Sequence, residues 1–157
     1  PNIRRIDVES AEEMYEEARR AYTDADAGIL CAAVADFTPD HTADHKIKRG
    51  KDGMTIQLKP TKDIAASLGA TKKEGQVLVG FALETNDEQQ NAKGKLERKN
   101  FDFIVLNSLN DKGAGFRVDT NKISIIDRQD TTSYPLKNKS EVAKDIIDRL
   151  VQTLNKN

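Results

Sequence analysis

Three cations stand within four residues of the chain, at Lys46, Lys48 and Arg49. Lysine presents a point charge to an anion, and arginine adds a planar fork of donors. The group is interpreted either as a solvated charge run or as a clamp for a phosphate or carboxylate. It lies in a polar stretch that begins just after Asp36 and has little periodicity. Spacing alone favours the solvated charge run. Because long irregular segments are often functional, the position after Asp36 raises the support for the clamp.

A second pair of cations, Lys95 and Lys99, has the i,i+4 spacing that puts both on one face of a helix. One interpretation is a solvent-facing pair balanced by Glu88 or Glu97. The other is a shared anionic or acceptor-rich partner, because like charges at this spacing repel slightly.

Polar side chains follow the apolar runs at Asp36 and Asn107, and Asp63 precedes one. A carboxylate at a strand end can hold Mg²⁺ jointly with substrate phosphates, or it can cap the next turn. Asn107 has the same ambiguity. Spacing alone favours capping.

Other chemistries have weak signals. His41 and His45 have a zinc-like spacing only if they are helical, and Pro39 argues against a helix there. Cys31, the single cysteine, lies within an apolar run and is predicted to be a small core residue. The nucleophile-elbow, P-loop and dinucleotide glycine motifs are absent from the sequence.

The elements that position these residues alternate between strands and helices. Apolar runs at 28–35, 76–83 and 101–106 predict strands covered on both faces. Helices are expected at 11–23, 63–68, 87–99 and 140–154, the first with a capping box of Ser10 and Glu13. Shorter strands are expected at 3–8, 54–58, 116–118, 123–126 and 134–136. The prediction is an α/β fold: a Rossmann-like, mostly parallel sheet with flanking helices and a small antiparallel β appendix.

Composition limits the possible partners. The chain has 157 residues and a formal net charge of −1, so it predicts one domain without a global attraction to nucleic acid or anionic lipid. No apolar run approaches the length of a membrane span. The lack of a basic-then-apolar leader points to the cytoplasm.

Several segments together resemble one family. They are AAVADF at 32–37, KIKR at 46–49, VGFALET at 79–85, KLERK at 95–99 and IVLN at 104–107. In this order and spacing they resemble phosphopantothenoylcysteine synthetase, the C-terminal half of a bifunctional coenzyme A biosynthesis protein. The resemblance covers essentially the whole chain.

The resemblance implies a CTP-dependent ligase that joins 4'-phosphopantothenate to cysteine through an acyl-cytidylate, with Mg²⁺. FMN would belong only to a flavin-dependent decarboxylase half, which is fused or associated in relatives, and not to this chain. The family forms homodimers, and the segment 116–136 is the candidate contact. The alternative is a non-catalytic module for nucleotide binding or dimerisation; a nicotinamide dehydrogenase is disfavoured by the missing glycine motif.

Residue roles follow from the same resemblance. Lys46 would serve acyl-cytidylate formation, with Lys48 and Arg49 as accessory cations on a flap. Asp36 would lie beside the nucleotide and its Mg²⁺, close to Ala33.

The remaining matches concern the nucleotide. Phe81 would flank the cytosine, and Lys95 and Lys99 would donate to its O2 and N3 acceptors. Asn107 and Asp63 would support the pocket. The two cation groups are thus expected to converge above the strand ends.

Two features depart from the family. The run 59–63, KPTKD, replaces a usual Lys-Asn-Pro-Asp, which weakens the transfer to Asp63. The family's opening strands and phosphate loop have no counterpart, so residues 1–157 are expected to form a single, incomplete ligase domain that is inactive alone.

Overall fold

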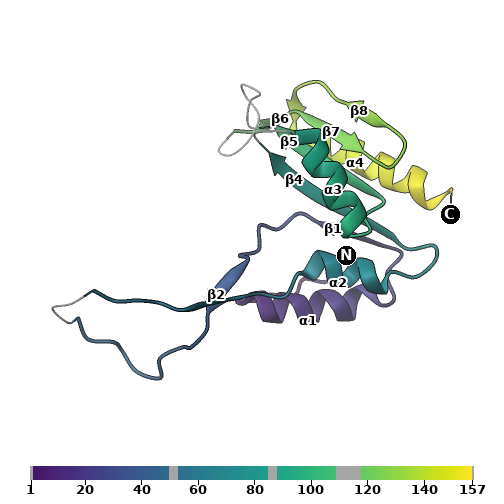
Figure 1. The fold of residues 1–157 in the computed structure, drawn as a ribbon. Coiled ribbons are helices and arrows are strands. Elements are labelled where there is room, and N and C mark those ends of the chain that lie inside the picture. Colours follow the sequence, from purple (N-terminus) through teal and green to yellow (C-terminus); the bar gives the residue numbers. More distant parts are fainter. Residues whose placement is uncertain (1, 50–52, 85–87, 109–117, 157) are drawn as a thin grey trace.

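The structure is a computed structural model that describes residues 2–49, 53–84, 88–108 and 118–156. A five-stranded sheet with the order β1-β4-β5-β7-β8 forms its centre (Figure 1). The first three strands of that order, β1 (Ala27–Leu30), β4 (Val77–Glu84) and β5 (Phe103–Ser108), are parallel. Strands β7 (Ile123–Ile126) and β8 (Thr131–Ser133) continue the sheet in antiparallel pairing. The predicted α/β class, with a mostly parallel sheet and antiparallel additions, is confirmed.

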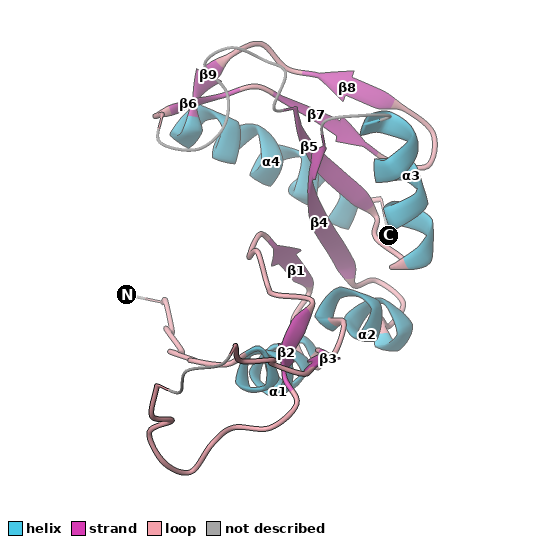
Figure 2. Ribbon diagram, turned by 60° about the vertical axis from the view of Figure 1, so that its left-hand side comes forward, coloured by secondary structure: helices cyan, strands magenta, loops and turns pink. Residues whose placement is uncertain are grey.

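Helices cover both faces of the sheet (Figure 2). On one side lie α1 (Ala11–Tyr22), α2 (Ile64–Thr71) and α3 (Glu88–Arg98), and on the other lies α4 (Lys139–Leu154). Side chains of β4 and β5 alternate between the two resulting cores. Burial on both faces explains why these strands read as continuous apolar runs.

The strand nearest the N-terminus differs from its prediction. The run 28–35 was expected to be buried on both faces, yet β1 ends at Leu30 and lies at the edge of the sheet. Ile29 is 39% exposed to solvent, and Cys31 is also exposed. The prediction of a core cysteine is therefore wrong. The physical reason is that only one neighbour, β4, pairs with β1 among the described strands.

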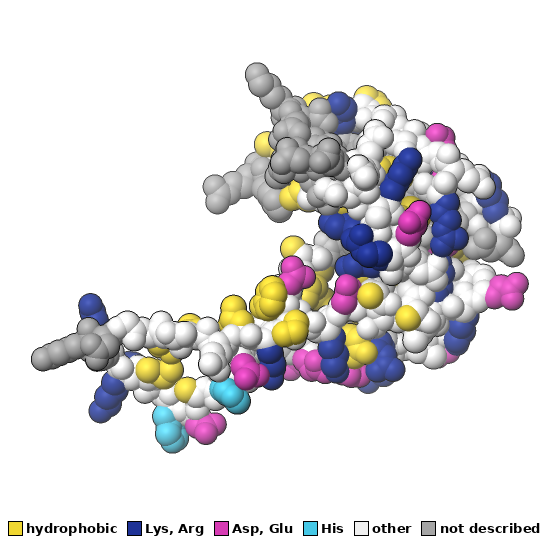
Figure 3. Space-filling model, in the orientation of Figure 1, with side chains coloured by type: hydrophobic (Ala, Val, Ile, Leu, Met, Phe, Trp, Pro, Cys, Tyr) yellow, Lys and Arg dark blue, Asp and Glu magenta, His cyan; other side chains and the backbone are white. Residues whose placement is uncertain are grey.

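An arm projects from the body between β1 and α2 (Figures 1 and 3). Its base is a two-stranded antiparallel ladder of β2 (Phe37–Pro39) and β3 (Leu58–Pro60). The predicted strand at 54–58 is therefore wrong except for its last residue. Apolar side chains along the arm are more than half exposed: Phe37, Ile47, Met54, Ile56 and Leu58.

A local signal places the start of α1 correctly, whereas the last helix begins at Lys139, one residue before its expected start, with Asn138 as its N-cap. Glu13 N–H donates to Ser10 Oγ at 3.1 Å, and Glu13 Oε2 accepts from Ser10 N–H at 3.1 Å, so the predicted capping box is confirmed. The expected end of α2 before Gly69 is wrong, because the helix continues to Thr71. Gly69 is needed there for a close approach: a Cβ at this position would lie 2.0 Å from Lys99 O.

The smaller strands agree only in part. The strand at 123–126 is confirmed, but 134–136 lies between β8 and β9 (Lys137–Asn138), which pairs with β6 (Thr120–Asn121). Most of the predicted strand 116–118 lies outside the described residues. The segment 3–8 is extended without pairing, and Ile3 is 88% exposed. No helix in the described part of the chain is long and apolar enough to cross a bilayer.

Candidate nucleotide and substrate site

A pocket of about 470 Å³ opens at the carboxyl end of β1, beside α1 and α2. This is the end of a parallel sheet at which ligands bind in open α/β folds. Its lining comes from α1, from β1 and the segment after it, from the start of α2 and the turn before it, and from the turn after α3. The side chains in that lining that carry polar groups or a thiol are those of Cys31, Asp36, Thr61, Lys62, Asp63 and Lys99. Three residues predicted from sequence, Asp36, Asp63 and Lys99, thus meet around one pocket.

Thr61 holds the AAVAD segment in place. Its Oγ1 donates to Ala35 O at 2.6 Å, and its N–H donates to Asp36 O at 2.9 Å. These bonds fix the backbone that carries the Asp36 carboxylate on the pocket wall. That carboxylate forms no ion pair within the described residues, so it is available to a ligand.

Asp63 links the start of α2 to the turn after α3. Its Oδ1 accepts from Ala66 N–H at 3.0 Å as the N-cap, and its Oδ2 lies 3.1 Å from Lys99 Nζ. Burial alone would raise the pKa of Asp63, but the Ala66 N–H and the Lys99 ammonium outweigh it and lower the pKa below its usual value. Of the two roles that the sequence left open, capping is confirmed, and the carboxylate also lines the pocket. A contact of Asp63 with Mg²⁺ stays a prediction.

Lys62 also lines the pocket, yet its ammonium turns toward α1. It pairs with Glu12 and stands 4.4 Å from the centroid of the Tyr15 ring. The hydrogen bond to Glu12 raises the pKa of Lys62. Lys62 therefore contributes packing between α1 and α2 more than a free charge.

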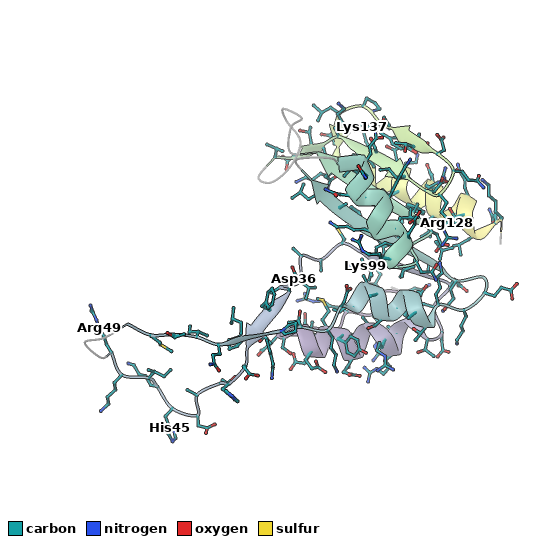
Figure 4. The ribbon with its side chains drawn as sticks, in the orientation of Figure 1. Asp36, His45, Arg49, Lys99, Arg128 and Lys137 are labelled. Carbon is teal, nitrogen blue, oxygen red and sulfur yellow. The ribbon has the colours of Figure 1, made fainter. Side chains whose placement is uncertain are left out.

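The basic group of the arm lies apart from this pocket. Lys46, Lys48 and Arg49 are exposed, and Figure 4 shows Arg49 at the far end of the arm while Lys99 lies in the body. His45, beside Lys46 in the sequence, also projects from the arm. Within one copy of the chain, the two predicted cation groups do not converge in this conformation.

The other predicted residues are not among those that line the pocket. Ala33 is exposed, and its neighbours Ala32 and Val34 line the pocket although it does not. Phe81 is half-buried against the core on the α4 side. Lys95 is half-buried on α3, and Asn107 accepts a hydrogen bond from Asn121 at 3.0 Å.

Metal ligands were predicted only at Asp36. The described residues hold no group of three or more His, Cys, Asp or Glu side chains that could bind a metal ion by themselves, and His41 with His45 does not form one. A single carboxylate is nevertheless compatible with Mg²⁺ that is held jointly with substrate phosphates. Asp36 fits that donor set, and its role remains a prediction.

Three pocket residues with polar or thiol side chains, Cys31, Thr61 and Lys62, were not predicted from the sequence. Cys31 was assigned to the core because its apolar neighbours suggested a covered strand. Thr61 was noted only within a segment that departs from the family. Their positions within two residues of the AAVAD segment or of Asp63 are the signal that could have indicated them.

Comparison with known proteins gives the family. Residues 1–154 match the family model described as the DNA/pantothenate metabolism flavoprotein C-terminal domain (DFP). The chain belongs to this family. The resemblance found in the sequence motifs is thereby confirmed.

Individual relatives agree with this assignment of the DFP domain. The chain is 44% identical over 146 residues to the coenzyme A biosynthesis bifunctional protein CoaBC of Bacillus subtilis (strain 168). The aligned region covers 92% of this chain and 36% of that protein. The chain is 57% identical over 151 residues to a protein of an unknown prokaryotic organism named cysteine/cysteine sulfinic acid decarboxylase, covering 96% of the chain and 42% of that protein. The chain therefore spans less than half of the length of these relatives.

The fold has a solved counterpart. The crystal structure of the C-terminal domain of CoaBC superposes with a TM-score of 0.78 at 32% identity, over 97% of this chain and 66% of that one. The architecture of the DFP domain described above is thus the architecture of the CoaBC C-terminal domain.

Proposed function

We propose that this DFP domain is the ligase part of a coenzyme A biosynthesis enzyme, and that it joins 4'-phosphopantothenate to cysteine at the expense of CTP. The observation that carries the proposal is the pocket at the end of β1, where Asp36 and Lys99 of the family motifs lie together with Asp63. Its volume of about 470 Å³ lies within the range of small-molecule sites.

The chemistry explains the need for cations. In the proposed first step the carboxylate of 4'-phosphopantothenate attacks the α-phosphorus of CTP, forming an acyl-cytidylate and releasing pyrophosphate. Two anions must approach each other, so fixed positive groups lower the barrier. In the second step the cysteine amine attacks the acyl carbon, forms the amide and expels CMP.

We assign roles to the residues as the motifs suggest. Lys99, held by Asp63, and Lys95 bind the base; Phe81 flanks it. Asp36 faces the phosphates, and Mg²⁺ bound there jointly with them would neutralise part of their charge. Ala33 and Asn107 support the ligands near the strand ends.

Lys46 is the proposed catalytic cation, with Lys48 and Arg49 as accessories. Because the arm projects away from the pocket, these cations require either closure of the arm or delivery to a second copy of the chain. We favour a homodimer in which the exposed apolar side chains of the arm, such as Phe37 and Leu58, are covered by the partner. The segment 116–136 remains the other predicted dimer contact.

The decisive experiment uses the full-length protein that carries this domain, which we expect to be cytoplasmic. Lys46→Gln should keep CTP binding within about threefold and lower cysteine-dependent CMP release at least a hundredfold, since a preorganised charge in an acyl-transfer site contributes about that much. Lys59→Gln removes one cation from the base of the same arm and should leave turnover nearly unchanged. Wild-type turnover in Lys46→Gln would favour the alternative, a non-catalytic nucleotide-binding or dimerisation module.

We also expect residues 1–157 to be inactive by themselves. The outer edge of β1 has no pairing strand among the described residues, and Ile29 and Cys31 beside it are exposed. An edge with apolar side chains on it is typical of a surface that another strand covers. Robust cysteine-dependent CMP release by the isolated chain would contradict this expectation.

Nucleotide preference has a direct measurement. Thermal unfolding of the chain with Mg²⁺ and either CTP, ATP, UTP or GTP should show the largest stabilisation with CTP, because bound ligand stabilises the folded state by mass action. Equal shifts with all four nucleotides would argue against the assigned base contacts of Lys95 and Lys99. FMN should cause no shift, because it belongs to the decarboxylase half of the relatives.

A further inference from the structure

Asn107 and Asn121 form a hydrogen-bonded pair of amides at the carboxyl end of the parallel sheet. Asn121 Nδ2 donates to Asn107 Oδ1 at 3.0 Å, and both side chains are partly buried. Asn107 belongs to β5, where it is in register with Leu83 of β4 and Ile123 of β7. Asn121 belongs to β6, which pairs with β9. The tertiary fold thus joins two strands that are 14 residues apart in the chain.

The direction of this hydrogen bond is determined by a second contact. Lys122 N–H donates to Asn121 Oδ1 at 3.0 Å. Because only an oxygen can accept from this N–H, the amide nitrogen of Asn121 must face Asn107. Asn107 must therefore accept with its oxygen.

A consequence follows for the other end of the Asn107 amide. With Oδ1 engaged by Asn121, the two N–H groups of Nδ2 point away from that contact, and the described residues offer them no acceptor. Strand ends at this edge of a parallel sheet are where ligands bind. Asn107 is therefore fixed as a hydrogen-bond donor, and its most suitable partner is an anionic oxygen.

We infer that Asn121 is a positioning residue that sets Asn107 as a donor to a phosphate or carboxylate oxygen of the substrates. This rests on the proposed ligase function and assigns Asn121 a part in it. Both CTP and 4'-phosphopantothenate carry such oxygens, and kinetics with each substrate distinguishes them.

Asn121→Asp tests the inference sharply. A carboxylate still accepts from Lys122 N–H, but it cannot donate to Asn107, so the Asn107 amide must turn over and present its oxygen to the ligand. In full-length protein we expect the KM for CTP or for 4'-phosphopantothenate to rise at least tenfold. Asn107→Asp, which also replaces the outward donor with an acceptor, should raise the KM for the same substrate.

Asn138→Asp is the matched control, because Asn138 lies on the neighbouring strand β9 and the change adds the same charge without touching Asn107. It should leave both KM values within twofold. Thermal melting of Asn121→Asp without ligand should lie within a few degrees of wild type. If that variant is unfolded, Asn121→Ser replaces it and should raise the same KM severalfold.

A second readout reports the amide itself. In ¹⁵N-labelled chain, the side-chain amide signal of Asn107, assigned by its loss in Asn107→Asp, should move when Asn121→Asp turns it toward a carboxylate. Wild-type KM values in Asn121→Asp, or a defect in Asn107→Asp alone, would overturn the positioning role while leaving the ligase intact. Absence of ligation by wild-type full-length protein would instead contradict the proposed function, and this inference with it.

Discussion

Lys99 and Asp63 form an ion pair, with 3.1 Å between Nζ and Oδ2, that joins the turn after α3 to the N-cap of α2 in the lining of the pocket. Neither residue is on a strand of the sheet. The pair therefore holds a cation at the pocket by means of the helices alone. It also makes the helix cap of α2 and the charge of the site depend on one carboxylate.

Replacing that carboxylate separates its two functions. Asp63→Asn keeps a good N-cap but removes the charge opposite Lys99, so we expect a stability loss below about 1 kcal/mol. CTP affinity should fall about three- to tenfold, because the lysine gains rotamer freedom. Asp63→Ala should cost about 1 kcal/mol more in stability, since it also removes the cap. Urea unfolding and calorimetric titration with CTP measure the two effects; equal stability of both variants would argue against the capping role.

Replacing either of two helical glycines, Gly69 or Gly94, with alanine should change the free energy of unfolding in opposite directions. Gly69→Ala places a Cβ 2.0 Å from Lys99 O, and overpacking against backbone should cost about 1–3 kcal/mol. Gly94→Ala on α3 meets only the far end of Arg98, 3.0 Å away, and should gain about 0.5–1 kcal/mol from helix propensity. Denaturant unfolding of both variants tests this. A stabilised Gly69→Ala would mean that α2 does not approach the turn after α3 so closely.

Cys31 should react with thiol reagents in the folded chain. It is exposed and lines the pocket, and it is the single cysteine in the sequence. N-ethylmaleimide should label native protein at a rate within about tenfold of that for unfolded protein, since exposure is a main determinant of thiol reactivity. CTP should slow the labelling, and the alkylated protein should bind CTP more weakly. Cys31→Ala gives the unlabelled control, and a thiol that reacts only after denaturation would contradict the edge position of β1.

Acid should weaken the fold through two carboxylates. Burial would raise the pKa of Asp127, but N–H groups of Asp130 and Gln129 and the charge of Arg149 outweigh it and lower the pKa, as happens at Asp63. A lowered folded-state pKa contributes stability that is present above the unfolded value, about 3.9, and is lost as pH falls through the folded value. The unfolding free energy should therefore decline below about pH 4 because of these groups.

Asp127→Asn provides the check on that pH dependence. The variant should be less stable than wild type at pH 7, and the difference should shrink as the pH falls below about 4. Urea titrations from pH 3 to pH 7 measure it. A difference that stays constant over this range would show that Asp127 has no depressed pKa.

Residues close together in the chain decided much of the structure in advance. The capping box of Ser10 and Glu13, the i,i+4 placement of Lys95 and Lys99, and the apolar runs of β4 and β5 depend on short-range backbone geometry and on burial of whole strands. The motif segments were sufficient to predict the family, and two of the motif residues, Asp36 and Lys99, meet at one pocket.

Long-range packing decided the rest. The run 28–35 has the same apolar character as β4, but position at the sheet edge left Cys31 exposed, and no local pattern distinguishes an edge from a centre. Asp63 pairs with Lys99, 36 residues later in the chain. Asn107, in the five-stranded sheet, is hydrogen-bonded to Asn121, in the two-stranded sheet of β6 and β9. Each of these contacts depends on how separate elements are brought together, because the free energy of such a pairing depends on neighbours that only the completed fold supplies.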